Sequence, residues 1–433
     1  MYNLDGKKLM VMDSTALAAC AVTRAKELGV KTIVANWYPV ENSPSKQVAD
    51  ETVEINISDI DAMLALIKER EVDGIFVGWT DSHLPYYAEI CARAGLPCCG
   101  TREQFDVLSN DKRLFKQSCL KYGVPTIPEY HLDIELRRED LDKLEYPVMV
   151  KPADESGSRG VRRCDNEEEL VDYYKQLYAS SRSKKILCEK YIESPNEIFI
   201  HYTVQNGHPS LSSSFMKHKA KTDDGIAASA ILHVFSSSYI DQFRATAEPA
   251  CIDLIKGVGI QNGMVMFQGF YQDGKFYFFE SGLRMGGEQF YVFAKRLNGI
   301  SSLDMMIEFA LTGNITCGDV KTQDNCKFSK TCVNYYITLK GGTIDRIEGL
   351  AEVEAMPQVL QNATFKKIGD VINNTNSLDR VIYRLHVMDD TPEALAETLH
   401  KISTTLRIYA KEGYEMQIEE LTYERALEML VNS

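Results

Sequence analysis

The chain has 433 residues, of which 44% are hydrophobic and 25% charged, and its formal net charge is −14. This length suffices for about three domains, and the composition is that of a globular protein with a sizeable core. The negative charge argues against binding driven by electrostatic attraction to nucleic acid or to anionic membranes.

We expect neither a signal peptide nor a membrane helix. The opening MYNLDGKKLMVMD lacks a basic start, an apolar run and a cleavage site. No apolar run approaches the roughly 20 residues that a membrane helix needs. The eleven cysteines include no CxxC pair and are interpreted as free thiols in a reducing compartment. A cytoplasmic protein is therefore expected.

Residues 1–100 alternate short apolar runs with amphipathic segments. This alternation predicts a parallel, doubly wound sheet. In the first helix we expect one face to carry Leu17, Cys20, Ala21 and Leu28. The expected strands cover residues 8–12, 32–35, 52–57 and 74–78, and the expected helices start near 14 and cover 60–70 and 85–94.

Polar residues follow the first and fourth of these strands. Ligands bind such sheets beyond the carboxyl ends of the strands, so Asp13-Ser14 and Trp79-Thr80-Asp81 are candidate pocket residues. A helix cap is the alternative for Thr80 and Asp81. No GxGxxG follows the first strand, so a dinucleotide fingerprint is absent.

A strand-end lysine and a small-residue loop come next. Asn110-Asp111-Lys112 opens a helix over residues 113–122, and an apolar strand over 146–152 ends near Lys151. The loop at 153–161, ADESGSRGV, is either a plain turn or a backbone cradle for phosphate.

Two more strands are expected before a long polar stretch. They cover residues 185–192 and 197–204. Residues 207–245 are interpreted as irregular, either a solvated loop or a lid. A helix over 248–257 follows.

Residues 265–287 read as two extended runs around the turn Gln272-Asp273-Gly274. Glu280 is expected at the tip of this buried hairpin, with Arg284 and a Gly286-Gly287 pair behind it. An acid and a guanidinium placed in this way predict a site for a metal–phosphate complex.

The remaining chain is expected to form a separate α+β unit. A helix covers residues 302–311. Strands are expected at 332–339, 343–347 and 381–388, and a helix begins at Thr391-Pro392, with proline at its first position.

The order of these pieces resembles the ATP-grasp superfamily of ADP-forming ligases, which includes biotin carboxylase, carbamoyl-phosphate synthetase and the L-amino-acid ligases. The resemblance implies an α/β and α+β protein with the ATP-grasp fold. It implies a Rossmann-like domain at 1–100, an ATP-grasp domain at 101–315 with a lid subdomain at about 130–204, and a C-terminal α+β domain at 316–433.

The same resemblance implies roles for individual residues. Lys112 and Lys151 match the phosphate lysines, and Glu197 matches the ribose ligand. Gln268 and Glu280 match the metal ligands, and Arg284 matches the arginine of E-x-N-x-R. The implied phosphate lid is Ser156, Gly157, Ser158, Arg159 and Gly160, and the implied adenine hinge is Glu189, Lys190, Tyr191 and Ile192.

The chain departs from the signature at Gly282, where the family has asparagine. One metal ligand is therefore missing from its usual place. For Lys112 the alternative is an ordinary surface lysine. For Arg284 it is an ion pair with an acid such as Glu288.

The chemistry that the resemblance implies needs these residue types. Phosphorylation of a carboxylate by ATP makes an acyl phosphate, which an amine can attack. Lys151, Arg284 and Glu280 are the expected catalytic residues, since they neutralise charge and hold metal. The expected cofactors are ATP and Mg²⁺, or Mn²⁺ in its place.

We therefore expect an ADP-forming carboxylate–amine ligase acting on amino acids or small peptides, because the C-terminal part resembles that of L-amino-acid ligases. The alternatives are a carbamoyl-phosphate-synthetase-like activity on bicarbonate and an ATP-binding sensor or scaffold with weak catalysis. The expected partners are small molecules, with no nucleic acid and no membrane, and the expected assembly is a homodimer.

Overall fold

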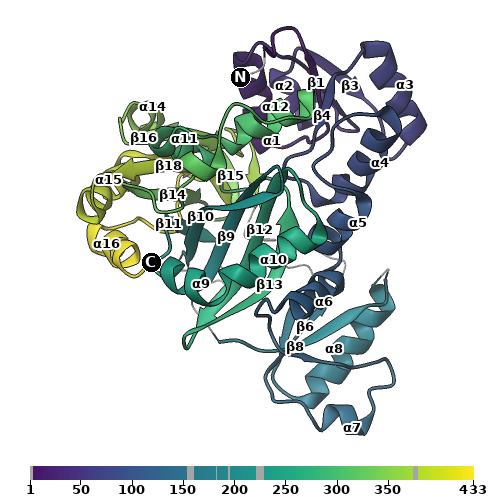
Figure 1. Ribbon diagram of the computed structural model, residues 1–433. Coiled ribbons are helices and arrows are strands. Elements are labelled where there is room, and N and C mark those ends of the chain that lie inside the picture. The colour runs from purple at the N-terminus through teal and green to yellow at the C-terminus, as the bar shows by residue number, and fades with distance from the viewer. Residues whose placement is uncertain (1–2, 154–159, 182, 194–195, 221–228, 374–378) are drawn as a thin grey trace.

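The structure is a computed structural model, and it describes residues 3–153, 160–181, 183–193, 196–220, 229–373 and 379–433. The described strands form four sheets, of four, eight, three and four strands. In Figure 1 the N-terminal sheet lies at the top, the large sheet in the centre and the C-terminal helices at the left.

The N-terminal sheet is parallel and has the order β3-β2-β1-β4, which confirms the prediction of a parallel sheet. Its apolar strands β1 and β4 are buried, whereas the outer β3 alternates half-buried and exposed residues. The strands are β1 (Lys8–Val11), β2 (Lys31–Asn36), β3 (Glu51–Glu54) and β4 (Gly74–Phe76), and the helices are α1 (Ala16–Glu27), α2 (Pro44–Val48), α3 (Ile60–Arg70) and α4 (Leu84–Ala94).

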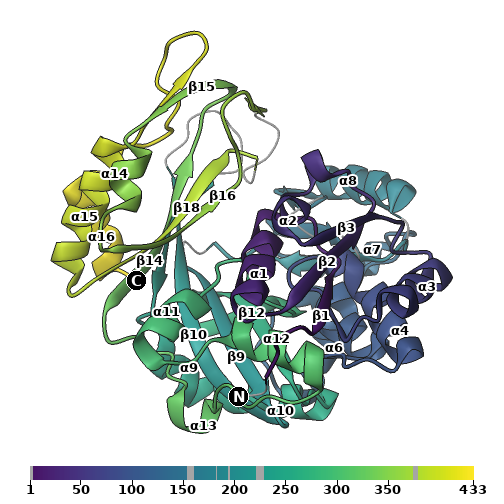
Figure 2. The same ribbon diagram turned by 90° about the horizontal axis from the view of Figure 1, so that it is seen from above.

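Helix α1 begins at Thr15, whose side chain accepts a hydrogen bond from the backbone N–H of Ala18. The expected face was right only in part. Ala21 is buried, together with Ala18, Val22 and Ala25, whereas the expected Leu17, Cys20 and Leu28 are half-buried. Small side chains allow this face to pack closely on the sheet. Cys20 turns instead toward β16 (Val359–Thr364), and Figure 2 shows α1 between the β1–β3 sheet and the C-terminal strands.

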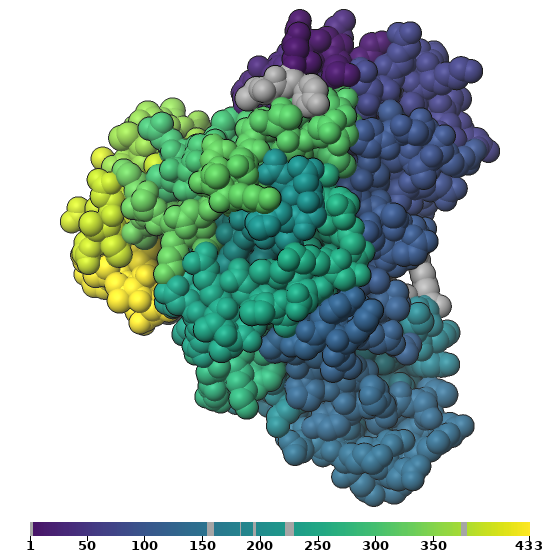
Figure 3. Space-filling model, in the orientation of Figure 1, coloured from purple at the N-terminus to yellow at the C-terminus, as the bar shows by residue number. Residues whose placement is uncertain are grey.

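A smaller antiparallel sheet, of order β5-β8-β6-β7, forms a lobe of its own. In Figure 3 this lobe projects at the bottom of the molecule. Its elements are β5 (Glu129–Tyr130), α7 (Arg138–Leu141), β6 (Val148–Pro152), β7 (Arg162–Cys164), α8 (Glu167–Ser180) and β8 (Ile186–Lys190). It is reached through α5 (Arg102–Phe105), the π-helical turn Asp106–Asn110 and α6 (Lys112–Tyr122).

The eight-stranded sheet has the order β13-β12-β9-β10-β11-β14-β18-β16, and its neighbouring strands are antiparallel. Its strands are β9 (Glu197–Gln205), β10 (His208–Lys219), β11 (Ala230–Phe235), β12 (Gly263–Gln272), β13 (Lys275–Leu283), β14 (Thr331–Thr338), β16 and β18 (Val381–Asp389). The helices that follow or precede these strands are α9 (Ile240–Thr246), α10 (Glu248–Val258), α11 (Tyr291–Asn298), α12 (Ser302–Thr312) and α13 (Val320–Gln323).

The interpretation of residues 207–245 as irregular was wrong, because β10, β11 and most of α9 lie there. Two of its serines are buried and hydrogen-bonded. The Ser212 hydroxyl bonds to Thr203 and Asp324, and the Ser214 hydroxyl accepts from the backbone of Ser237. Residues 221–228 of this stretch lie outside the described residues.

The large sheet runs across the predicted domain boundary at 315/316, since β14 pairs with β11. The boundary itself stays a prediction. The C-terminal part adds a three-stranded sheet with β15 (Gly342–Glu348), β17 (Val371–Ile372) and β19 (Arg407–Ala410), and the helices α14 (Leu350–Glu354), α15 (Pro392–Thr405) and α16 (Tyr423–Val431). Among the described residues, no helix combines the length and apolarity that a membrane span requires.

Candidate active site

The two expected metal ligands face each other across the β12–β13 hairpin. Gln268 and Glu280 are cross-strand partners, next to a register shift between Gln268 and Gly269. The expected place of Glu280 at the hairpin tip was wrong, because β13 continues to Leu283. The Gln268 Nε2 donates to Glu197 Oε1 at 2.6 Å. Two carboxylates and one amide therefore gather on one face of the sheet.

This donor set fits Mg²⁺. Within the described ranges, no three His, Cys, Asp or Glu side chains are grouped so that they could hold a metal ion. A metal here would use Glu280, the Gln268 amide oxygen and oxygens of phosphate and water, which is the hard-oxygen shell that Mg²⁺ prefers. At Gly282 an added Cβ would lie 3.3 Å from Met266 Cγ and 3.6 Å from Arg284 Cγ, so a side chain at this position would contact both neighbours.

Lys112 points at this donor set. It is the first residue of α6, whose start is capped by the Asp111 carboxylate. Its Nζ lies 3.4 Å from Glu280 Oε1, and the lysine side chain is 16% exposed. The alternative of an ordinary surface lysine does not describe this position.

Lys151 belongs to a buried ionic group in the β6–β8 lobe. Its Nζ lies 2.6 Å from Glu189 Oε2, and the Lys116 Nζ lies 2.6 Å from Glu189 Oε1. Burial would raise the pKa of Glu189, but the two lysine charges outweigh it and hold that pKa below its usual value. The ionised Glu189 side chain thus points toward the lysines.

In the expected adenine hinge, two backbone N–H groups are already hydrogen-bonded to other residues of the lobe. The N–H of Lys190 donates to Pro128 O at 2.9 Å, and the N–H of Tyr191 donates to Pro147 O at 3.3 Å. Ile192 follows β8 and is half-buried.

Most of the expected phosphate lid, Ser156, Gly157, Ser158 and Arg159, lies outside the described residues. Gly160 is described and has φ +67°, a conformation that favours glycine. Its carbonyl accepts from the Tyr173 hydroxyl at 3.0 Å, which fixes the C-terminal end of the loop to α8.

Glu197 is 8% exposed and begins a polar row that crosses the sheet. It pairs with Lys217 of β10 in the strand register and by an ion pair at 3.3 Å. The register continues from Lys217 to His233 and then to Asn334. From there it continues to His386 and Gln361. Side chains in register share a face, so this row runs from the hairpin end of the sheet to β16.

Arg284 binds Asp81, not Glu288. Its Nε donates to Asp81 Oδ1 at 2.6 Å, and its Nη1 donates to Met285 O at 3.1 Å. Thr80 has the cap position of the short helix at 81–83 without the capping bond, and the Asp81 carboxylate is used in the ion pair with Arg284. The hairpin arginine and the N-terminal sheet meet at this ion pair.

Asp13, the other pocket candidate, holds the loop after β4. Its Oδ2 accepts from the N–H groups of Gly78 and Trp79 at 2.7 and 3.0 Å, and its Oδ1 lies 3.2 Å from His83 Nδ1. Burial would raise the pKa of Asp13, but the bonds to His83 and its neighbours lower it overall. Asp13 therefore holds the loop that carries Asp81 and does not itself face a ligand position. Its neighbour Ser14 is half-buried.

Sequence reasoning missed a second polar group, which gathers around Glu288. The Glu288 Oε1 lies 3.1 Å from His201 Nε2, and both residues are at most 5% exposed. The Glu288 carbonyl accepts from Asn334 Nδ2 at 2.6 Å and lies 3.0 Å from His386 Nε2. The available signal was a polar residue at alternate positions of apolar strands, as in ILHVF and YRLHVM.

Arg384 of β18 is also part of this group. Its guanidinium donates to the Gly287 carbonyl and to the Gln289 amide oxygen. The residue is 3% exposed. Arg384 thus lies next to the loop that follows Arg284.

Burial sets the protonation states in this group. Burial would raise the pKa of Glu288, but His201 outweighs it and the pKa is lowered, so the carboxylate is ionised. Burial lowers the pKa of His386 to about 3 and that of His233 well below its usual value. Both imidazoles are neutral at pH 7.

The site combines carboxylate and amide oxygens at the hairpin, lysines beside them and two arginines farther along the same face. Comparisons with known proteins name the class. Residues 111–310 match the family described as carbamoyl-phosphate synthase L chain, ATP binding domain.

Among curated proteins, the 2-oxoglutarate carboxylase small subunit of Hydrogenobacter thermophilus is 32% identical over 209 residues. The match covers 44% of this chain and 44% of that protein, so the chain spans less than half of the relative's length.

Solved structures cover nearly the whole chain. The L-amino acid ligase of Bacillus licheniformis matches with TM-score 0.76 and 19% identity, covering 94% of this chain and 99% of that one. The biotin carboxylase domain dimer of H. thermophilus 2-oxoglutarate carboxylase, solved with MgADP, ADP and bicarbonate, matches with TM-score 0.76 and 19% identity, covering 95% and 91%. The chain thus has the ATP-grasp fold, and residues 111–310 are similar to the ATP-binding domain of the carbamoyl-phosphate synthase L chain.

Proposed function

We propose that this chain is an ATP-dependent, ADP-forming carboxylate–amine ligase that joins amino acids or small peptides through an acyl phosphate. The observation that carries the proposal is the single sheet face. It bears the oxygen donors Gln268 and Glu280 at one end and Arg384 at the other, and Arg284 lies in the loop in front.

At the hairpin end the chain would hold the phosphate tail of ATP. Lys112 lies within ion-pair distance of Glu280, and Lys151 is buried at the end of β6. Their charges offset the repulsion between a polyphosphate and an incoming carboxylate. Glu280 and Gln268 would hold Mg²⁺, which supplies further positive charge to the phosphates when bound.

At the arginine end the chain would hold the carboxylate. Arg284 and Arg384 offer guanidinium groups that match carboxylate geometry. A carboxylate oxygen then attacks the γ-phosphorus and ADP leaves, which gives the acyl phosphate. The amine nitrogen attacks the acyl carbon and phosphate leaves.

The attacking amine must lose a proton, and Glu288 is the group that would accept it. Glu288 is ionised beside His201, and its backbone is fixed by Asn334 and His386. An ionised carboxylate also attracts the ammonium form of the amine before it reacts.

Bicarbonate is a second candidate for the carboxyl substrate. The matched family is that of carbamoyl-phosphate synthase, and the H. thermophilus structure was solved with bicarbonate. The two arginines would serve this smaller anion equally well. The chemistry would again start with phosphorylation of the carboxyl oxygen and release of ADP.

The test is a screen of the purified chain with Mg-ATP against pairs of amino acids, and against bicarbonate with ammonia. ADP release that depends on an amino-acid pair supports the proposed ligase. Release that depends on bicarbonate supports the second candidate. AMP release contradicts the acyl phosphate, and ATP binding without turnover supports a sensor or scaffold.

A further inference from the structure

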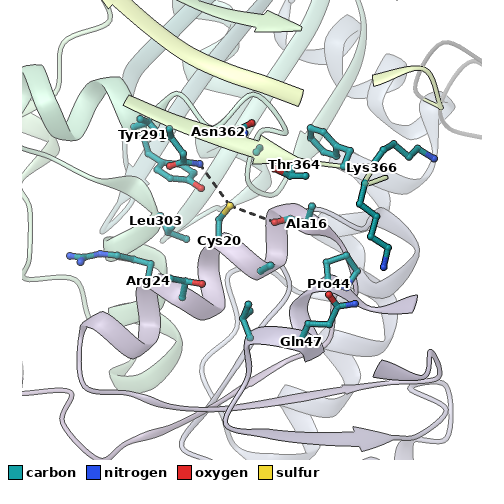
Figure 4. Close-up of a pocket in the computed structure, with 18 of the residues that line it drawn as sticks. Ala16, Cys20, Arg24, Pro44, Gln47, Tyr291, Leu303, Asn362, Thr364 and Lys366 are labelled. Carbon is teal, nitrogen blue, oxygen red and sulfur yellow. Dashed lines mark hydrogen bonds between the residues drawn. The ribbon is translucent and has the colours of Figure 1, made fainter. Parts of the chain in front are cut away.

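A large cleft lies away from the hairpin, between the N-terminal sheet unit and the C-terminal strands. Its volume is about 1140 Å³, which is above the range of about 300–1,000 Å³ that holds most small ligands. Figure 4 shows α1 on one side, with Ala16, Cys20 and Arg24, and Asn362, Thr364 and Lys366 across from it. The cleft is therefore wide enough for a small molecule that contacts both units.

The charges along the cleft are balanced. Four cations line it, and four acids line it. Part of this charge is already paired, because Arg24 and Lys295 both bind Asp304, at 2.7 and 3.1 Å. The cations are Arg24, Lys295, Lys366 and Lys367, and the acids are Glu27, Glu41, Asp304 and Asp370.

Charges of both signs remain outside these pairs. Among the residues that the structure describes, Lys367 and Asp370 on the C-terminal wall and Glu41 on the N-terminal wall take part in no side-chain ion pair, although the Asp370 carboxylate accepts from the Lys367 backbone N–H at 2.9 Å. A balanced cleft of this kind does not favour a polyanion such as a nucleotide. It favours a molecule with one carboxylate for the lysine side and one ammonium for the glutamate side.

The inner end of the cleft touches the arginine end of the active site. Gln361 Nε2 donates to Gln289 Oε1 at 3.3 Å and approaches Cys20 Sγ at 3.8 Å. The same Gln289 oxygen accepts from Arg384, and Gln289 Nε2 donates to the Tyr291 hydroxyl at 2.6 Å. One amide thus joins the cleft to the buried guanidinium.

The position of Gln289, between the cleft and Arg384, is fixed by burial and by its backbone conformation. It is fully buried, and its φ of +56° is a left-handed conformation that non-glycine residues rarely adopt. Burial raises the pKa of the Cys20 thiol, and the charge of Arg384 offsets part of that rise. The guanidinium is therefore close enough to act on the cleft electrostatically.

We propose that this cleft is a second binding site for a small zwitterion, an amino acid or a dipeptide, and that Gln361 and Gln289 couple it to Arg384. The choice of amino acid or dipeptide rests on the proposed function, whereas the zwitterion follows from the charges of the cleft. The carboxylate binds beside Lys367 and the ammonium beside Glu41. Linkage requires that occupation of either site changes affinity at the other.

Calorimetric titration of the full chain tests the site. The probes are the twenty proteinogenic L-amino acids and L-alanyl-L-alanine, without nucleotide. At least one probe is expected to bind, and Lys367→Glu and Glu41→Gln are each expected to weaken that binding about tenfold or more, since each removes an ionic contact. The matched control is Lys68→Glu, on the exposed side of α3, which leaves the affinity unchanged.

Two results overturn the site. Binding of none of the probes does so, and so does binding that survives both cleft variants, because the zwitterion then lies at the reaction centre. Sedimentation of the same variants tests whether a second copy of this chain fills the cleft instead. If Lys367→Glu changes the oligomeric state and no probe binds, the cleft is an interface between copies of this chain.

The coupling is tested by repeating the titration with Mg-ADP. The dissociation constant of the wild type is expected to change about fivefold or more, within the usual range of coupling between sites. Gln289→Leu removes this change, and Gln289→Glu, which keeps an oxygen for Arg384, retains it in part. An unchanged constant in the wild type overturns the coupling.

The Glu280→Gln variant separates this inference from the proposed function. It is expected to bind the zwitterion in the cleft as the wild type does, because Glu280 lies at the far end of the sheet. Cleft binding in a wild type that turns over none of the screened pairs contradicts the ligase alone. Turnover without cleft binding contradicts the cleft site alone.

Discussion

Single residues decide how charge is held in this molecule. Glu280 faces Lys112 at the β12–β13 hairpin, Glu189 is buried between Lys116 and Lys151, and Arg284 binds Asp81. Of these groups, Glu189 and its two lysines are buried most deeply, and such charges are expensive to bury without their partners. We therefore expect a change at Glu280 to affect turnover and a change at Glu189 to affect stability.

Glu280→Gln is expected to lower ADP formation by about two orders of magnitude or more, because the loss of a carboxylate at a metal site removes several kcal/mol of charge stabilisation. Thermal unfolding should change little, since Gln268 and Lys112 remain as polar neighbours. The control is Glu348→Gln on β15, whose partner Arg346 is exposed. Unchanged turnover would place the metal elsewhere.

Glu189→Gln is expected to destabilise the chain by about 3–5 kcal/mol at pH 7, because two buried lysines lose their counter-ion. The folded-state pKa of Glu189 is lowered, so its stabilisation is present above the unfolded value of about 4.3 and is lost as pH falls through the folded pKa.

Urea unfolding of the wild type and of Glu189→Gln at pH 7 and at successively lower pH measures this effect. The difference between the two proteins should be largest at pH 7 and should shrink below about pH 4.3. A difference that is constant with pH would contradict a charged Glu189.

Whole elements were predictable where the sequence pattern is local. Helix α3 has the predicted bounds 60–70, since Asp59 caps it and Met63 and Ile67 mark its buried stripe. The β12–β13 hairpin was predicted from its turn. β10 was missed because its serines are buried against polar neighbours.

Arg384 and Glu288 were not predicted as site residues because their contact is not local in the sequence. Arg384 and Glu288 lie far apart in sequence, and only the pairing of β18 with β14 brings them together. No spacing in the sequence encodes that contact. By contrast, Gln268 and Glu280 belong to one hairpin, so their pairing was accessible to sequence reasoning.

The contact between β4 and α12 predicts a sensitive glycine. A Cβ added at Gly74 would lie 2.0 Å from the Ala310 carbonyl oxygen, which is backbone and cannot rotate away. Gly74→Ala is therefore expected to lower the free energy of unfolding by about 3 kcal/mol or more, the upper range of overpacking. Chemical denaturation measures it.

Gly287→Ala is the matched control for stability, because the nearest atom to its added Cβ is 3.9 Å away. An equal loss in both variants would mean that β4 and α12 can separate without cost.

At the scale of the whole molecule, the eight-stranded sheet joins parts that the sequence predicts as separate domains. Strands β14, β18 and β16 continue the sheet of β9–β13 without a break. A chain of residues 1–315 would expose the β11 edge, and such edges aggregate.

We therefore expect the 1–315 fragment to lose the cooperative thermal transition of the full chain and to elute as aggregate. Circular dichroism and size-exclusion chromatography measure both. A monomeric fragment with a sharp transition would instead support the predicted boundary at 315/316.

The continuous sheet also limits which parts of the molecule can move during a catalytic cycle. The hairpin and β16 are its two outer edges, and neighbouring strands are about 4.8 Å apart, so the seven steps between them fix a span of about 34 Å. The separate sheet of β5–β8 shares no strand with it. A hinge motion that opens and closes the site therefore belongs to that lobe, on the microsecond-to-millisecond scale of such motions. Relaxation-dispersion signals are expected in residues 129–190, and the edges of the large sheet should behave as one rigid body.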